Sequence, residues 1–199
     1  WVKAGAPEGA RVTPVPSPHQ SDWQLGKPDL VVTLPDYTLR PEGLDVFRNF
    51  VVAIPGAGTR YVRGLEFHPG SPAVHHANIR IDYTATGERM DQADPGPGYE
   101  GVIPRTADYP DGHFLGWTPG QVPPVAPKGL AWRLDEHGRF VVQLHMRPNG
   151  KAEPVRPAIG LFFTNDAPTQ RRVMLRLARQ NIDIPAGEAR YLSVDEYTV

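Results

Sequence analysis

The sequence predicts an all-β protein, most simply an antiparallel β-sandwich with a jelly-roll-like arrangement. Short runs rich in β-branched and aromatic residues recur along the chain, and several of them alternate apolar with polar side chains as half-buried strands do. The 23 prolines and 20 glycines are spread between these runs, where they act as turn signals. Strands of this length joined by turns favour one sandwich whose sheets pack face to face.

The chain divides into an arm and a domain. Residues 1–28 are rich in proline and show no hydrophobic period, which is typical of an irregular arm or linker, and regular structure is expected from near Trp23. Residues 29–199 are expected to form the sandwich. Its clearest strands are predicted at 29–34, 46–54, 60–67, 74–83, 129–134, 139–146 and 159–164.

Two further regions are interpreted from their turn residues and from their neighbours in sequence. Residues 84–128 contain several Pro and Gly pairs and are expected to be a long loop. The segment Arg171–Gln180 has good helix formers but also alternates, with Val173, Leu175 and Leu177 on one face. Because its neighbours in sequence are strands, we interpret it as a strand, followed by an apolar run with a turn at 182–187 and a last strand at 191–199.

Composition excludes several classes of function. The 21 basic and 22 acidic residues leave no net field to attract nucleic acid. No apolar stretch is long enough to cross a bilayer. Cysteine is absent, which removes disulfides, thiolate nucleophiles and cysteine-based metal sites. A metal ion would have to be held by histidine, carboxylate, methionine or backbone oxygen.

Three of the seven histidines form a candidate metal site. His75 and His76 are adjacent, and neighbours on a regular strand point to opposite faces, so one ion can bind both only if the strand ends, bends or bulges there. His145 lies on the face of its strand opposite to Phe140, Val142 and Leu144, away from the core. Neutral imidazoles suit copper, zinc, iron and nickel, and this chemistry alone does not separate copper from zinc.

Other residues offer weaker alternatives. His113, in the long loop, is a possible additional ligand, although a packing role is the simpler interpretation. Trp117 and Trp132 could line a sugar-binding surface, but such residues more often pack in a core. Three aspartates near the loop could form a weak calcium site or simply be solvated: Asp82, Asp91 and Asp94.

The order of several short motifs resembles a known family. After the His75-His76 pair come Gly116-Trp117-Thr118-Pro119-Gly120 and then Pro127-Lys128-Gly129. The Gln-x-His element at Gln143-Leu144-His145 follows, and Ile184-Pro185-Ala186-Gly187 comes last. Together these motifs are similar to the N-terminal domain of the copper type II, ascorbate-dependent monooxygenases, the family of peptidylglycine α-hydroxylating and dopamine β-monooxygenases, and most similar to bacterial members. The resemblance runs from about Asp45 to the C-terminus.

The resemblance implies a specific role. It implies a jelly-roll-like sandwich in which His75, His76 and His145 hold the copper ion that passes electrons from ascorbate. A second domain of the family binds O₂ on another copper through a His-x-His pair and a Met, and no His-x-His occurs in these 199 residues. The fragment alone is therefore expected to be inactive, and whether it belongs to a complete copper type II monooxygenase stays open.

Partners and location follow as expectations. The chain begins with Trp and no signal peptide precedes it, so it looks like a processed or excised piece. The family's use of copper and O₂ implies a periplasmic or extracellular place, with a second copper domain or another protein as partner. An alternative function is a non-catalytic structural or interaction subunit that keeps the fold and docks through its Pro-rich arm.

Overall fold

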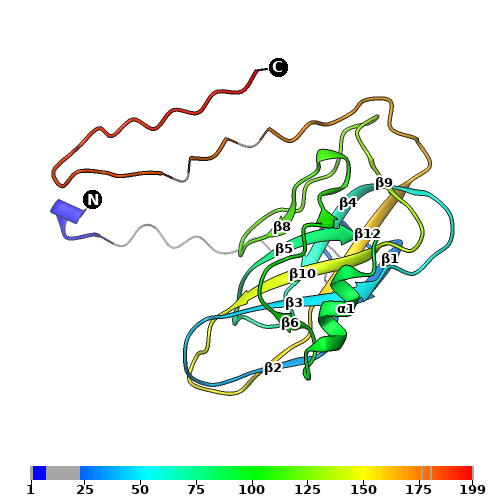
Figure 1. Cartoon of the computed structure of the whole chain (residues 1–199), viewed down its shortest axis with the longest axis horizontal. Helices are drawn as coiled ribbons and strands as arrows, with labels where there is room; N and C mark the ends of the chain where they lie inside the picture. Colours follow the sequence, from blue (N-terminus) through cyan, green and yellow to red (C-terminus); the bar gives the residue numbers. More distant parts are fainter. Residues whose placement is uncertain (1, 8–22, 176, 180, 199) are drawn as a thin grey trace.

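The computed structural model describes residues 2–7, 23–175, 177–179 and 181–198. Two antiparallel sheets pack against each other, which confirms the predicted all-β sandwich (Figure 1). The larger sheet is ordered β6-β3-β10-β5-β7, with β8 also paired to β5. In that order the strands are Tyr99–Glu100, Val46–Ala53, Arg139–Met146, Val74–Asp82, Ala107–Asp108 and, for β8, Leu115–Trp117.

The second sheet has four strands in the order β1-β12-β4-β9. They are Leu30–Thr33, Ala158–Thr164, Arg60–His68 and Trp132–Leu134. A small third sheet pairs β2 (Tyr37–Leu39) with β11 (Glu153–Val155). The turn at 135–138 connects β9 to β10, so it carries the chain from one sheet to the other and does not close a hairpin.

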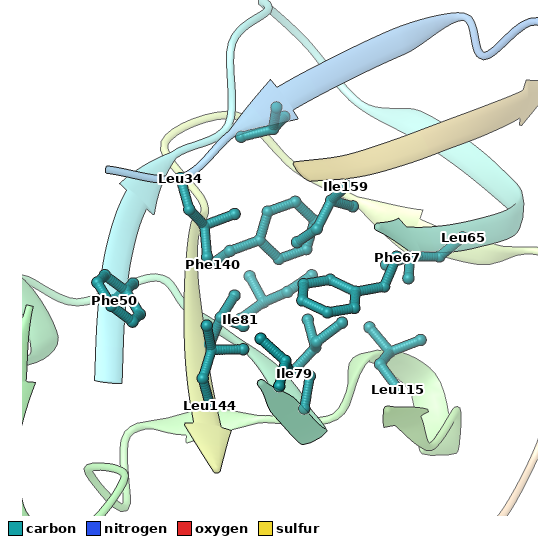
Figure 2. Packing of buried hydrophobic residues seen from close by; sticks show 14 of the residues in the cluster. Leu34, Phe50, Leu65, Phe67, Ile79, Ile81, Leu115, Phe140, Leu144 and Ile159 are labelled. Carbon is teal, nitrogen blue, oxygen red and sulfur yellow. The ribbon is translucent and has the colours of Figure 1, made fainter. Parts of the chain in front are cut away.

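The core lies between the inner faces of the two large sheets. Phe140 and Leu144 of β10 and Ile79 of β5 are fully buried, and they face Ile159 of the opposite sheet (Figure 2). The same alternation directs every second residue of β10 and β5 to the outer face, because successive side chains on a strand point in opposite directions. The strands that build the core therefore also present His76 and His145 on the outside.

A short helix covers only part of this outer face. Helix α1 (Thr86–Ala93) follows β5, and Gly87 packs so closely that an added Cβ would lie 3.2 Å from the Val141 side chain. Between β5 and α1, the carboxylate of Asp82 accepts the N–H groups of Thr84 and Gly87 at 2.8 and 2.9 Å. Helix α1 covers the outer face around Val141, whereas His145 lies four residues further along β10, toward the end of the strand.

The chain before β1 is tied to the second sheet. The buried carboxylate of Glu66 accepts the N–H groups of Gln24 and Leu25 at 2.8 and 3.0 Å. The ring of Trp23 stacks on His68 at 3.6 Å. Among the described residues, Trp23 to Leu25 therefore contact the second sheet directly. Most of the predicted Pro-rich arm, residues 8–22, lies outside the described residues, and Val2–Ala4 forms one 3₁₀ turn.

Two regions differ from the sequence prediction. The stretch 84–128, predicted as loop, contains α1, three short strands and a 3₁₀ turn at Pro110–Gly112. After β12 no strand occurs in the described residues, so the strands predicted at 171–180 and 191–199 were wrong for the described parts of those segments. Figure 1 shows this C-terminal segment running away from the sandwich and turning back. Alternation favours a strand only where a partner edge and a buried face are available.

Within the described residues, no helix has the length and apolar character that crossing a membrane requires.

Candidate metal centre

The register of two strands brings the three histidines together. In the ladder between β5 and β10, His145 pairs with His76, but the next residue, Met146, pairs with Val74. His75 is therefore an extra residue on β5, which is the definition of a β-bulge. Because a bulge redirects one side chain, the adjacent His75 and His76 can turn toward the same point, as the sequence prediction required.

The Nδ1 atoms of the three rings converge. The Nδ1 atom of His76 lies 3.2 Å from that of His75 and 3.3 Å from that of His145. Taking one ligand nitrogen from each ring, all the chosen atoms lie within 4.8 Å of one another. A tetrahedral ion with metal–nitrogen bonds of 2.0–2.1 Å needs nitrogens about 3.3 Å apart. These three residues could therefore hold a metal ion, and the two Nδ1 separations from His76 match that spacing.

The protonation of the site favours ligand chemistry. Burial lowers the pKa of His76, and the nearby rings of His145 and His75 lower it further because two imidazolium charges repel. A lowered pKa keeps His76 neutral near pH 7, and only a neutral imidazole has a lone pair to donate to a metal. His75 is exposed and His76 and His145 are half-buried, so the cluster is open to solvent on one side.

Strand β3 fixes the ring of His145 from two directions. Phe47 pairs with His145 across β3 and β10, and the two rings stack at 4.2 Å with an interplanar angle of 11°. The carboxylate of Asp45, the residue before β3, lies 2.6 Å from Nε2 of His145. Sequence reasoning missed both residues, since Asp45 is 100 positions from His145 and no local pattern connects them.

A row of amides adjoins the histidines. Asn49, Gln143 and Asn78 lie opposite one another on β3, β10 and β5, two residues along each strand from the row that contains His145 and His76. Gln143 donates to the side-chain oxygen of Asn49 at 3.2 Å, and the hydroxyl of Tyr109 donates to Asn78 at 2.8 Å. These bonds hold the strip next to the cluster polar and ordered.

The weaker candidates occupy structural positions. His113 is not one of the three clustered histidines. It is buried, its Nε2 lies 2.8 Å from the carbonyl of Leu130, and its Nδ1 lies 3.2 and 3.1 Å from the carbonyls of Pro110 and Asp111. These contacts fit the packing role that the sequence favoured. Trp132 is buried at 2 % exposure, so it cannot line a sugar-binding surface.

The fold and the cluster define a class of protein, a β-sandwich with three histidines converging on the outer face of one sheet. No protein-family model, no curated protein and no solved structure matches this chain.

Proposed function

We propose that this domain holds one copper ion on His75, His76 and His145 and serves as an electron-transfer centre of the copper type II kind. The observation that carries the proposal is that the Nδ1 atom of His76 lies 3.2 Å from that of His75 and 3.3 Å from that of His145, close to the spacing that ligands of one tetrahedral ion need. No other group of three or more possible ligands of the His, Cys, Asp or Glu type occurs among the described residues.

The donor set is compatible with copper, and the motif resemblance favours copper over zinc. Three neutral imidazoles bind copper in both of its common oxidation states, and no thiolate is present to direct the site toward a blue-copper centre. Bound there, the ion would supply one-electron exchange. The chain's own residues orient the ligands: Phe47 covers one face of the His145 ring, and the exposed His75 leaves its side of the cluster open to a small reductant.

The motif resemblance supports a wider proposal. In it, the domain is the electron-supplying half of an ascorbate-dependent copper monooxygenase-like protein in a periplasmic or extracellular setting. The O₂-activating copper would then belong to a second domain or a separate partner, because the sequence has no His-x-His pair. The hydroxylation reaction would be a property of that complete assembly.

A second candidate function is an interaction subunit, and one observation favours it. The C-terminal segment leaves several large apolar side chains exposed, among them Val173, Leu175 and Leu177 at 73, 51 and 57 %. Such a run is typical of a surface that another protein covers. Docking through the Pro-rich arm concerns residues that lie mostly outside the described part of the chain.

Redox cycling tests the proposed function. The full chain is stripped with a chelator, loaded with one equivalent of Cu(II) and passed through a desalting column. Ascorbate is expected to abolish the Cu(II) EPR signal, and a mild oxidant such as ferricyanide is expected to restore it over several cycles. His137→Ala serves as a control, because that side chain is 84 % exposed and contributes nothing to the cluster. Copper that elutes with buffer, or that ascorbate does not reduce, would refute the proposal.

A further inference from the structure

We propose that Asp45 is a positioning residue for the metal centre: its carboxylate holds His145 in the tautomer whose Nδ1 carries the free lone pair. This inference rests on the proposed metal-binding function and adds a residue to it. Metal-bound histidines commonly donate their second ring N–H to a carboxylate, and the bond fixes both the tautomer and the ring orientation.

The two nitrogens of His145 face different partners. Nε2 lies 2.6 Å from Oδ2 of Asp45, and Nδ1 lies 3.3 Å from Nδ1 of His76, inside the cluster. A neutral imidazole carries one ring proton. Because an ionised carboxylate only accepts hydrogen bonds, the proton must reside on Nε2 and be donated to Asp45. Nδ1 is then left bare and directed at the position that the other two Nδ1 atoms share.

Local structure holds Asp45 in place for this role. It directly precedes β3, and Phe47, two residues further on, stacks on the same imidazole. Strand β3 therefore supplies the ring that packs on the face of His145, and the residue just before β3 supplies the carboxylate that binds its edge. The side chain of His145 is only 12 % exposed, so water competes little for Nε2. The Nε of Arg147 lies 4.0 Å from the other oxygen of Asp45.

Asp45 supports only His145 among the three histidines. In the described residues, no carboxylate forms an ion pair with His75 or His76, so Asp45 is the only charged support that the structure gives to the cluster. Removal of that carboxylate should change the tautomer of His145 and leave the other two rings unaffected. It should also weaken metal binding by about 10- to 100-fold, the usual cost of losing such a support.

The test measures tautomer and affinity separately. The full chain, metal-free and labelled with ¹⁵N at histidine, is studied by NMR as wild type, Asp45→Ala, Asp45→Asn and Asp45→Glu. The control is Asp36→Ala, because Asp36 is exposed and pairs with Arg156 away from the cluster. Copper affinity of each protein is then measured by competition with a chelator.

We expect wild type and the control to show His145 protonated at Nε2. Asp45→Ala should mix the two tautomers of His145 and bind copper about 10- to 100-fold more weakly. Asp45→Asn should lose the preference for the Nε2-protonated tautomer, because its amide can donate as well as accept. Asp45→Glu should restore that preference in part. An unchanged His145 tautomer together with unchanged affinity in Asp45→Ala would overturn the inference. Failure of the wild type to bind copper would instead refute the metal centre, while the metal-free spectra would still decide the role of Asp45.

Discussion

His145 lies directly opposite His76 in the ladder between β10 and β5, and one residue further on the register shifts. This single irregularity brings an adjacent His-His pair, which a flat strand would split between core and solvent, to one side of the sheet, where both rings could hold the same ion. The strand that supplies His145 is otherwise among the most regular in the sandwich, with Phe140, Val142, Leu144 and Met146 fully buried. Metal binding and folding should therefore be separable by mutation.

His75→Ala and Leu144→Ala should affect different properties. His75 is exposed, so its replacement is expected to change the free energy of unfolding by less than about 0.5 kcal/mol while abolishing tight copper binding. Leu144 is fully buried, and its truncation should cost about 2–5 kcal/mol. Urea denaturation and copper titration on the same metal-free samples check both. A large loss of stability in His75→Ala would mean that the bulge is part of the core.

Gly70 should be sensitive to substitution because it shapes the chain that enters the bulge. Its φ is +66°, and an added Cβ would lie 2.0 Å from the carbonyl oxygen of Arg156. Gly120 has φ +82° but nothing within 4 Å, so Gly120→Ala should cost only the left-handed strain of about 1–2 kcal/mol. Gly70→Ala should lower the free energy of unfolding, measured by urea denaturation, by clearly more than Gly120→Ala does. Equal losses in the two variants would show that the backbone around Arg156 moves aside freely.

Asp82 should make stability depend on pH in the acid range. Burial opposes ionisation of this carboxyl, but hydrogen bonds from Gly87 and Thr84 outweigh burial and lower its pKa below the ordinary 3.8. The folded state therefore binds its proton less readily than the unfolded chain. The resulting stabilisation is fully present above the ordinary pKa and is lost as the pH falls through the folded value.

The matched variant for this effect is Asp82→Asn. Its stability difference from the wild type should be largest near neutral pH and should narrow below about pH 4, where the unfolded carboxyl begins to take up a proton. Denaturation curves of both metal-free proteins from pH 7 to pH 3 give the comparison. A difference that stays constant with pH would show that Asp82 contributes through shape alone.

The C-terminal segment should be dispensable for the metal centre. Residues from 171 onward contribute nothing to the buried core among the described residues, whereas Thr169 and Gln170 still donate to the carbonyl of Gly129. A chain ending at Gln170 is expected to keep its thermal transition and its copper affinity and to gain solubility as exposed apolar side chains are removed. Loss of copper binding on truncation would place part of this segment in the site.

The sequence predicts the sandwich and the clustering of the three histidines for clear physical reasons. Alternation on β10 separates Phe140 and Leu144 from His145 without ambiguity, and β5 repeats the pattern with Ile79 and Ile81. Convergence of His75 and His76 depends on a bulge, which is a property of two strands together. Asp45 and Phe47 reach the cluster through the pairing of β3 with β10, and nothing local to either residue indicates that contact.

The errors have an equally specific cause. The alternation of Val173, Leu175 and Leu177 indicates an extended chain with one apolar face. It does not indicate whether a partner strand is present. Helix α1 is only eight residues long and contains Gly87, so its helical propensity is weak. It begins where Asp82 accepts the N–H of Gly87, five residues further on, and Gly87 packs against Val141 of β10, a contact made by tertiary structure.

The most direct test of the central claim is a copper titration of the chelator-stripped full chain, followed by calorimetry and Cu(II) EPR. His75→Ala, His76→Ala and His145→Ala are compared with wild type, and His137→Ala is the control. We expect wild type and control to bind one tight equivalent of copper with a nitrogen-rich type II spectrum, and each of the other three variants to lose it. Weak binding that is indifferent to those three substitutions would contradict it.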